Sequence, residues 1–471
     1  MNILHYFLGF PPFHDGGLRI YATDLAQEQF KKGHKVKMIM PGIYVHPYFK
    51  SKIKFYRFQK RLPVYQIINS HPVSFFGVSS PSEFISEKRK NNYRIFLEKH
   101  NIEVLHVHSL IGFPKELLDE AKSLKIKTVF TTHDYYGLCP KIDFFKYDNT
   151  ICNDYENGKE CVLCNYINQN VKKNIRKRNL KIILSKYIKH YNFIKATYHF
   201  LKGKNNINKN GNLNSTEILD FKNMKIDKNI ANEFVKFRYY YKNIIEKFDA
   251  IIFNSTITKN EYSKYVDLSN LKFKILPVTH SEIKDNRFTL NYTSIKNNKV
   301  NLLFMGYLNK KKGFWDLVNV LENLKEQYTN WQLNIYGNYS NIDINKFDQR
   351  FFKFYGKYKY NDLPKIFSNS SVLIIPSKLR ETFGFIGLEA YSYGIPAIVS
   401  KNVGFSDLIK NGINGIVYEE DNNNIYLKES IIKVLKNPQL LEKFNKEILK
   451  DNFDYTLENH CKEILDFYKN I

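Results

Sequence analysis

The sequence ETFGFIGLEAYSYGIP, residues 381–396, sets two carboxylates eight positions apart across a predicted turn from strand to helix. Before it, Val372–Ile375 is a short apolar run that predicts a buried parallel strand. After it, Gly394 predicts the end of a helix. In such a strand, loop and helix unit, ligands bind at the carboxyl end of the strand. Glu381 is therefore expected in the loop, and Glu389 inside the helix.

The residue types in this stretch suit a nucleotide sugar. Backbone amides in the first turn of a helix lack partners within the helix, so the turn after Gly384 can hold a diphosphate. A carboxylate further along the helix can accept two hydrogen bonds from a ribose diol, and one in the loop can meet sugar hydroxyls. The alternative is a Glu favoured by the helix dipole together with an unrelated solvated Glu.

This run resembles the paired-glutamate motif of family 4 glycosyltransferases, retaining enzymes of the two-domain GT-B fold that transfer a sugar from a nucleotide donor. The resemblance implies that Glu381 contacts donor-sugar hydroxyls in catalysis and that Glu389 holds the ribose. It also implies donor-binding roles for backbone amides: those of Phe383 and Gly384 would line the sugar, and those of Phe385 and Ile386 would bind the diphosphate.

A second match lies upstream, where Asn301–Met305 predicts a strand and the loop after it ends in Lys312 and Gly313. Family members typically show Gly-Arg-Leu, three residues, and then Lys-Gly. The resemblance implies that Lys312 binds the diphosphate and assists catalysis. Tyr307 stands where an arginine is usual, so Lys310 or Lys311 would have to supply the second cation. A lysine-rich loop alone more often indicates a solvated surface.

The amino-terminal half supplies two further matches. Gly16 and Gly17 open a predicted helix after the predicted strand Asn2–Leu8, and they resemble the family's loop over the donor phosphates, although a glycine pair alone indicates a turn. The predicted strand Lys127–Thr132 brings His133 to its carboxyl end. The resemblance places His133 near the donor sugar and the reacting centre, whereas a lone histidine is usually structural.

With 471 residues, the chain exceeds what one core normally supports, and alternating strand and helix patterns predict parallel sheets. We therefore expect an α/β protein with two Rossmann-like domains that face each other across a cleft. The expected organisation is an acceptor-binding domain at 1–278 with an insertion at about 139–245, a linker at 279–297, a nucleotide-sugar-binding domain at 298–452, and a helix at 453–471 that returns to the first domain.

The net charge of +26 indicates an acidic partner. The excess concentrates between Asn165 and Lys204, which contains no Asp or Glu, and Ile175, Leu180 and Ile183 recur there roughly in helical phase. A basic amphipathic helix of this kind predicts binding to an anionic membrane surface. The alternative is a solvated basic face over a core-packed stripe. Nucleic acid is not expected, because no recognition motif for it occurs.

No apolar run of about 18 residues or more and no secretory signal occur, so we expect a cytoplasmic protein. The basic segment adds the option that the protein attaches peripherally to the inner face of the membrane.

Four cysteines, Cys139, Cys152, Cys161 and Cys164, fall within 26 residues. In a cytosolic chain this clustering favours a metal over disulfides, and four thiolates suit a structural zinc. The alternative is free thiols packed in a loop.

The expected function is metal-independent, retaining transfer of a sugar from a nucleotide-diphosphate sugar to a cell-envelope glycan or lipid-linked acceptor. No cofactor is expected for catalysis, because no Asp-x-Asp in a donor loop offers a site for a divalent cation. Same-face attack with Lys312 stabilising the leaving group fits the motifs. Alternatives are a nucleotide-sugar epimerase or a phosphorylase on the same fold, or a non-catalytic basic subunit that binds a membrane or a partner, which Tyr307 favours.

Overall fold

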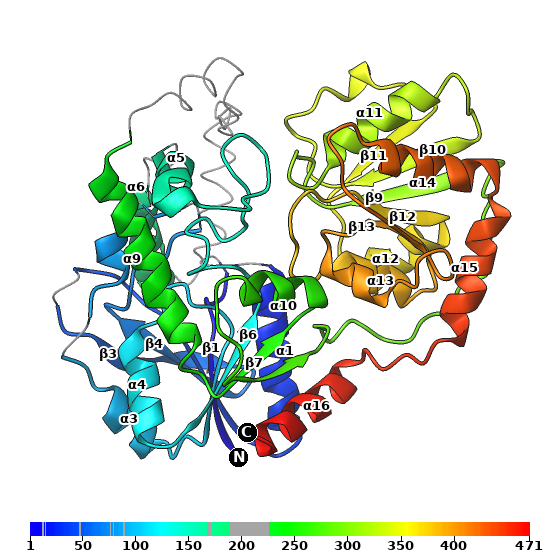
Figure 1. The fold of residues 1–471 in the computed structure, drawn as a ribbon. Coiled ribbons are helices and arrows are strands. Elements are labelled where there is room, and N and C mark those ends of the chain that lie inside the picture. Colours follow the sequence, from blue (N-terminus) through cyan, green and yellow to red (C-terminus); the bar gives the residue numbers. More distant parts are fainter. Residues whose placement is uncertain are drawn as a thin grey trace. The chain divides into compact units, whose positions relative to one another are not determined.

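In the computed structural model, the chain forms two compact units (Figure 1). Unit 1 comprises Met1–Ile252, Glu261–Lys274 and Glu463–Ile471, and unit 2 comprises Phe253–Asn260 and Ile275–Lys462. The structure describes residues 1–11, 14, 16–46, 49–75, 77–78, 80–87, 90–166, 171–187 and 226–471.

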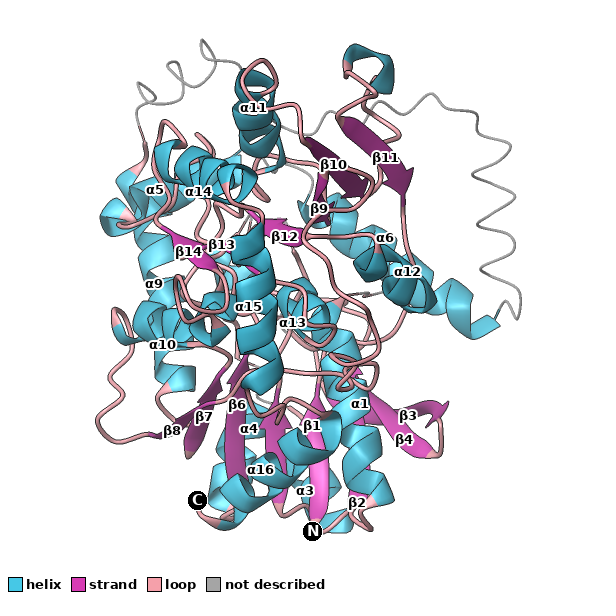
Figure 2. Ribbon diagram, turned by 90° about the vertical axis from the view of Figure 1, so that its right-hand side faces the viewer, coloured by secondary structure: helices cyan, strands magenta, loops and turns pink. Residues whose placement is uncertain are grey.

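Unit 1 is built on an eight-stranded sheet of order β3-β4-β2-β1-β5-β6-β7-β8 (Figure 2). Its strands are β1 (Asn2–Tyr6), β2 (Lys35–Pro41), β3 (Lys52–Gln59), β4 (Leu62–Ile68), β5 (Val104–Val107), β6 (Lys127–Thr132), β7 (Ala250–Phe253) and β8 (Lys272–Ile275). The pairs from β4 to β6 are parallel, with Ile3 opposite both Val36 and Val104, and β3 pairs antiparallel with β4.

Helices between these strands cover the sheet. They are α1 (Gly17–Lys31), α2 (Pro81–Phe84), α3 (Tyr93–Lys99), α4 (Lys115–Ser123), η1 (Glu156–Gly158), α5 (Lys159–Tyr166), α6 (Val171–Tyr187), α9 (Lys228–Ile245) and α10 (Thr256–Ser263), the last shared with unit 2. Helix α1 begins after Gly16, as predicted, and its Ala22 and Ala26 pack with Val36 and Met38 of β2.

Unit 2 contains a six-stranded parallel sheet of order β11-β10-β9-β12-β13-β14. Its strands are β9 (Val300–Met305), β10 (Trp331–Tyr336), β11 (Phe352–Gly356), β12 (Val372–Ile375), β13 (Ala397–Ser400) and β14 (Ile416–Tyr418). The predicted strand at 372–375 is β12, and all four of its residues are buried. Such continuous burial is expected of a parallel strand that is covered on both faces.

The helical segments of unit 2 are α11 (Phe314–Leu324), η2 (Ile344–Lys346), η3 (Tyr360–Asp362), α12 (Leu363–Ser368), α13 (Phe385–Tyr391), η4 (Gly404–Leu408), α14 (Ile425–Lys436) and α15 (Gln439–Lys450), followed by α16 (Leu457–Lys469). Trp331, Phe314 and Ile431 share one buried core between the sheet and these helices. Two α/β units with predominantly parallel sheets confirm the predicted fold class.

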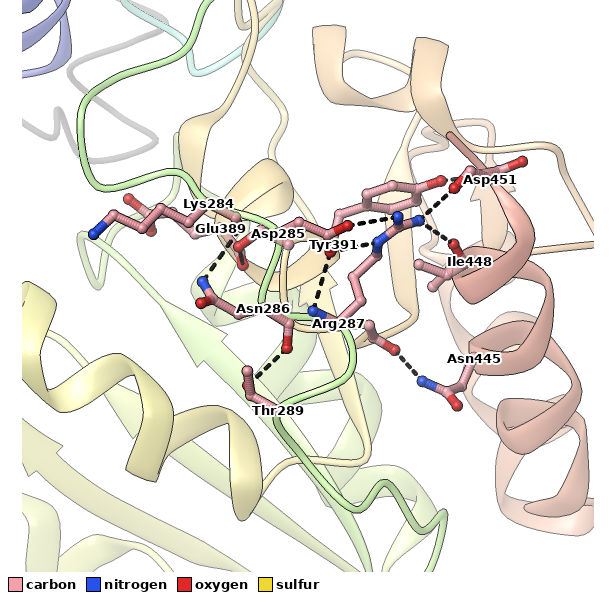
Figure 3. A network of polar contacts seen from close by, with 12 residues as sticks. Lys284, Asp285, Asn286, Arg287, Thr289, Glu389, Tyr391, Asn445, Ile448 and Asp451 are labelled. Carbon is pink, nitrogen blue, oxygen red and sulfur yellow. Dashed lines mark hydrogen bonds and ion pairs between the residues drawn. The ribbon is translucent and has the colours of Figure 1, made fainter. Parts of the chain in front are cut away.

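The segment 279–297, which the sequence suggested as a linker, belongs to the compact body of unit 2. The backbone amide of Asn286 donates to Ser392 O at 2.8 Å. The Arg287 guanidinium donates to Ile448 O and Asp451 O at the end of α15, and also to the Asp285 carboxylate (Figure 3). The irregular polar composition of this segment therefore reflects its use in capping a helix, where it satisfies carbonyls that the helix leaves unpaired.

The last turn of α16 is attached to unit 1. Tyr468 Oη is hydrogen-bonded to His106 Nδ1 at 2.5 Å, and Lys127 Nζ donates to Tyr468 O at 2.8 Å. Residues from Glu463 onward belong to unit 1, whereas the first turns of the helix belong to unit 2. The crossing of the whole helix between two domains stays a prediction. None of the helices in the described ranges is long and apolar enough to span a bilayer.

Replacing Arg287 by Ala is expected to destabilise unit 2 by about 2 to 4 kcal/mol, because buried carbonyls and the Asp285 carboxylate lose their donors. Both tryptophans of the chain, Trp315 and Trp331, lie in unit 2, so tryptophan fluorescence during urea unfolding reports on this unit. The control is Arg350→Ala, which removes an exposed partner of Asp348 and should change the midpoint little. Equal midpoints for the two variants would contradict the capping role.

Candidate functional site

The loop between β12 and α13 is held by backbone bonds to the segment after β13. The Glu381 amide donates to Asn402 O at 2.8 Å, and Gly404 N donates back to Glu381 O at 3.0 Å. Phe405 N donates to Phe383 O at 2.7 Å. Residues 381–383 therefore run like a short extra strand, which fixes where the Glu381 side chain begins.

Gly384 turns the chain from this loop into α13. It has φ of 102°, in the left-handed region that favours glycine, and an added Cβ would meet Val403 Cγ1 at 2.9 Å. Because α13 begins at Phe385, the amides of Phe385 and Ile386 have no acceptor within the helix. The turn predicted from the sequence is thus present, and its binding of a diphosphate stays a prediction.

Lys312 and Glu381, two of the three residues predicted for catalysis, meet in unit 2. Lys312 Nζ lies 2.8 Å from Glu381 Oε2, and Glu381 Oε1 is buried without a partner. The loop after β9 reaches this position because Lys311 O accepts hydrogen bonds from the amides of Lys378 and Leu379. Gly313, at φ of 67°, permits the approach, since an added Cβ would lie 1.7 Å from the carbonyl oxygen of Pro376.

Tyr307 stands where the resembled family usually has an arginine, and its uncharged side chain cannot replace that cation. Its side chain is 74% exposed. Lys311 contributes its backbone carbonyl to this region, where it accepts hydrogen bonds from the amides of Lys378 and Leu379. Lys312 is therefore the cation of this loop that the structure places against Glu381.

Glu389, the second predicted glutamate, lies inside α13 and is only 3% exposed. Its Oε1 lies 3.3 Å from His280 Nε2, and its Oε2 is buried without a partner. His280 is 1% exposed, and its Nδ1 faces the amide of Glu282, which donates to it at 3.3 Å. In the neutral imidazole this pattern assigns the proton to Nε2, which lies on the side of Glu389 but forms no hydrogen bond with it.

Sequence reasoning missed His280, because it falls in the segment that was assigned to the linker. The signal that could have identified it is its position two residues after the apolar run Leu276–Val278, since loops that follow such runs often carry functional side chains. Its ring packs between Tyr360 and Phe385, with centroids 5.1 Å away in both cases. This packing fixes the orientation of the imidazole beside Glu389.

The chemistry of this region of unit 2 follows from its unsatisfied groups. Glu381 Oε1 and Glu389 Oε2 are both buried and accept no hydrogen bond. A buried carboxylate oxygen without a donor costs free energy, so a ligand that brings hydroxyl groups would be stabilised here. The nearby Lys312 ammonium would in turn favour an anionic group.

In unit 1, His133 directly follows β6, as predicted, and lies beside α1, the helix that Gly16 and Gly17 open. The centroid of its ring is 4.6 Å from that of Tyr21 on α1 and 5.7 Å from that of His108. Tyr21 therefore connects the predicted residues of this unit: it lies on the helix that Gly16 and Gly17 open, and its ring contacts that of His133. Their contact with a donor stays a prediction.

Asp134, next to His133, accepts hydrogen bonds from Ser109 Oγ at 3.0 Å and from the Tyr136 amide at 2.9 Å. Burial raises the pKa of its carboxyl to about 6, against the effect of these two hydrogen bonds, which lower it. The Asp134 carbonyl accepts from Tyr262 Oη at 2.7 Å. Asp134 thus fixes the backbone that carries His133.

Three buried histidines, His5, His106 and His108, have ring nitrogens within 4.8 Å of one another. We assign them to a hydrogen-bond network and not to a metal site. His5 binds His108 at 2.9 Å and Gln29 at 2.7 Å, and His106 is bound by Thr131 and Tyr468. Burial lowers the pKa of His5 to about 4 and that of His108 well below its usual value, so both are neutral at pH 7.

Of the basic segment predicted for the membrane, residues 165–166 and 171–187 are described, and residues 167–170 and 188–204 lie outside the described residues. Within α6, Arg178 donates to Pro41 O and Gly42 O, which fastens the helix to unit 1. Ile175 is buried, whereas Leu180 and Ile183 are exposed. The expected single apolar stripe is therefore wrong for these residues, because positions five apart fall on different faces of a helix.

The four cysteines of the predicted metal site lie together in unit 1. Cys139, Cys152, Cys161 and Cys164 are buried thiols without disulfides, and all four line one small cavity. The structure therefore brings together the residues that the sequence grouped. Metal binding at this position stays a proposal.

Two protein-family models match this chain, one in each unit. Residues 15–166 match the model of glycosyltransferase family 4, and residues 286–451 match that of glycosyl transferases group 1. A protein of the cps region of Klebsiella pneumoniae is 29% identical over 200 residues, covering 41% of this chain and 54% of that protein. An uncharacterized glycosyltransferase of Methanocaldococcus jannaschii is 25% identical over 215 residues, covering 45% of this chain and 56% of that protein. The chain thus spans about half the length of these curated relatives.

Solved structures resemble the whole chain. A sucrose-phosphate synthase from Thermosynechococcus elongatus has a TM-score of 0.55 at 14% identity and covers 100% of this chain and 98% of its own. Anabaena HepE in complex with UDP and glucose has a TM-score of 0.51 at 13% identity, with 100% of both chains covered. These likenesses show the GT-B fold. The two family models, which match residues in both units, show that the chain belongs to the family 4 glycosyltransferases.

Proposed function

We propose that this protein is a retaining glycosyltransferase that moves a sugar from a nucleotide-diphosphate sugar to a cell-envelope glycan or a lipid-linked acceptor. The observation that carries the proposal is the arrangement in unit 2, where Lys312 meets Glu381 and where both Glu381 and Glu389 keep a buried oxygen without a donor. A nucleotide sugar has the diphosphate, the sugar hydroxyls and the ribose diol that these groups would bind.

Each residue has a distinct part in the proposed reaction. The Lys312 ammonium and the first amides of α13 stabilise negative charge on the departing nucleotide diphosphate. Glu381 orients the donor sugar through its hydroxyls, and Glu389 orients the nucleoside through its ribose, held in turn by His280. Retention follows when the acceptor hydroxyl attacks the anomeric carbon from the face that the diphosphate leaves and gives its proton to the departing phosphate.

The comparisons support this choice of substrates. HepE, whose structure contains UDP and glucose, supports a nucleotide-sugar donor. The relative from a cps region and a solved glycosyltransferase of lipopolysaccharide biosynthesis, WaaG, with a TM-score of 0.51, support an envelope acceptor. An epimerase or a phosphorylase would act on the donor alone or with phosphate. A non-catalytic subunit, which the exposed Tyr307 favours, would show no turnover with any acceptor.

Replacing Glu389 by Ala should weaken donor binding at least about tenfold, because a carboxylate that accepts hydrogen bonds from a diol contributes roughly 1.5 to 3 kcal/mol. The measurement is the shift in melting temperature produced by a panel of nucleotide sugars, since a ligand stabilises the folded state by mass action. His280→Ala should give a smaller loss, and His280→Gln should restore part of it. Glu419→Ala removes an exposed glutamate that is paired with Lys401, and it should bind donor normally. Normal binding by Glu389→Ala would refute the assignment.

Transfer is expected to proceed without a divalent cation, because Lys312 takes the place of a metal beside the leaving group. Initial rates should be unchanged when excess EDTA is added immediately before the donor. Zinc in the same samples should be measured, so that loss of a structural ion is not mistaken for loss of a catalytic one. Activity that EDTA abolishes and magnesium or manganese restores would contradict metal-independent transfer.

We further propose that the exposed face of α6 binds an anionic membrane surface, where a lipid-linked acceptor would be found. This face carries Lys172, Lys173, Arg176 and Lys177 together with the exposed Leu180 and Ile183. Arg178 and Asn179 hold the other side of the helix against residues 41–44. Cations interspersed with apolar side chains on a helix that is already anchored fit a lipid surface.

Changing these four exposed cations of α6 to Glu should abolish binding to vesicles that contain phosphatidylglycerol, because each basic residue near such a surface contributes about 1 kcal/mol. Co-sedimentation with vesicles is the measurement, and pure phosphatidylcholine vesicles give the baseline. The matched control changes four exposed lysines of unit 2, Lys428, Lys433, Lys436 and Lys446, to Glu. An equal loss in both variants would show that net charge alone matters and would refute a binding face on α6.

A further inference from the structure

Unit 1 contains a small cavity with a volume of about 10 Å³, and Cys139, Cys152, Cys161 and Cys164 all line it. The cysteines come from two parts of the chain, the loop after β6 and helix α5. Phe144 and Phe145 complete part of the wall, and Arg238 of α9 reaches the cavity from a helix further along the sequence. Thus four soft ligand groups surround a space of atomic size.

Arg238 is the second observation that points to a ligand. Its side chain is 6% exposed, and its Nε and Nη1 are buried without a partner. Its Nη2 donates to Cys161 Sγ at 3.4 Å, and its guanidinium lies 4.1 Å from the centroid of the Tyr155 ring. Within the described ranges, no carboxylate forms an ion pair with it. A buried cation without a counter-charge costs several kcal/mol, so the cavity beside it should carry negative charge.

Thiolates can supply that charge, but several thiolates in one small cavity would repel one another. A divalent metal removes the conflict. Four cysteine thiols that bind Zn²⁺ release four protons, and the resulting tetrathiolate complex carries two negative charges. Arg238 compensates one of them, and Lys141 also lines the cavity. The Glu160 carboxylate in the same wall is paired with Lys146, whose Nζ lies 3.4 Å from its Oε2. The charge of this wall therefore matches a zinc tetrathiolate better than it matches four neutral thiols.

We propose that Cys139, Cys152, Cys161 and Cys164 bind one structural zinc ion, with Arg238 as its buried counter-cation. A space of about 10 Å³ holds a single atom-sized guest, which excludes an iron–sulfur cluster at this position. No three of the four sulfur atoms lie within 4.8 Å of one another, whereas the ring nitrogens of the three histidines do. Zinc binding would therefore draw them together, to separations of about 3.8 Å in a tetrahedron with Zn–S bonds of about 2.3 Å.

The proposed ion would fasten the segment that follows His133 and Asp134. Cys139 N donates to Tyr135 O at 2.8 Å, so the first ligand is held one turn after Tyr135, in the loop that follows β6. Further along, Gly158 of η1 packs so closely on α9 that an added Cβ would lie 2.1 Å from Ala231 O. The metal would thus join residues 139–164 and α9 into one rigid body beside His133.

The test is the metal content of the full-length protein after purification in reducing buffer with zinc supplied. We expect about one zinc per chain, and the cobalt(II) form should show thiolate-to-cobalt charge transfer and intense tetrahedral bands. Cys161→Ser with Cys164→Ser should lose the metal, whereas Cys461→Ser, which alters a thiol outside the cavity, should keep it. Arg238→Met should lower zinc affinity about 10- to 100-fold, as is typical for groups that support metal ligands.

The wild-type measurements stand even where a cysteine variant fails to fold. A folded wild-type chain that takes up no zinc, with all four thiols reduced when they are counted after unfolding, would overturn the proposal. So would iron together with inorganic sulfide at this position. Zinc binding that Arg238→Met leaves unchanged would overturn the role of the arginine.

Discussion

The contact between Lys312 and Glu381 is the interaction on which the account of unit 2 depends. The 2.8 Å pair forms only because two loops from different strands are held together. Lys311 O accepts from the loop after β12, and Gly313 lies so close to Pro376 O that no side chain would fit. Backbone geometry thus brings a cation and a carboxylate to the carboxyl edge of the sheet, where α/β proteins bind ligands.

A second constraint is the presence of buried groups that lack partners. Glu381 Oε1, Glu389 Oε2 and the Nε of Arg238 are all buried without hydrogen bonds. In native structures such groups are usually completed by a protein group, an ordered water, an ion or a ligand. In unit 2 the two carboxylates call for a hydroxyl-bearing ligand, and in unit 1 the arginine calls for negative charge among the cysteines. The same physical argument therefore leads to the donor and to the zinc.

The sequence predicted the elements around the site well, because apolar runs such as Val372–Ile375 and glycines such as Gly384 have local causes. It also grouped the four cysteines correctly. It did not identify His280, because this residue lies in an irregular segment and its contact with Glu389 of α13 depends on packing between residues far apart in the sequence. It also failed on the apolar stripe of α6, where Ile175 is buried and Leu180 is exposed. Which of the two is buried depends on the surface against which the helix packs.

A crystal structure of the protein with a nucleoside diphosphate tests the central claim most directly. The account predicts that both ribose hydroxyls lie about 2.6 to 3.0 Å from the Glu389 carboxylate, with the diphosphate against Lys312 Nζ and the amides of Phe385 and Ile386. A nucleotide bound elsewhere in unit 2, with Glu389 still in contact with His280 alone, would contradict it.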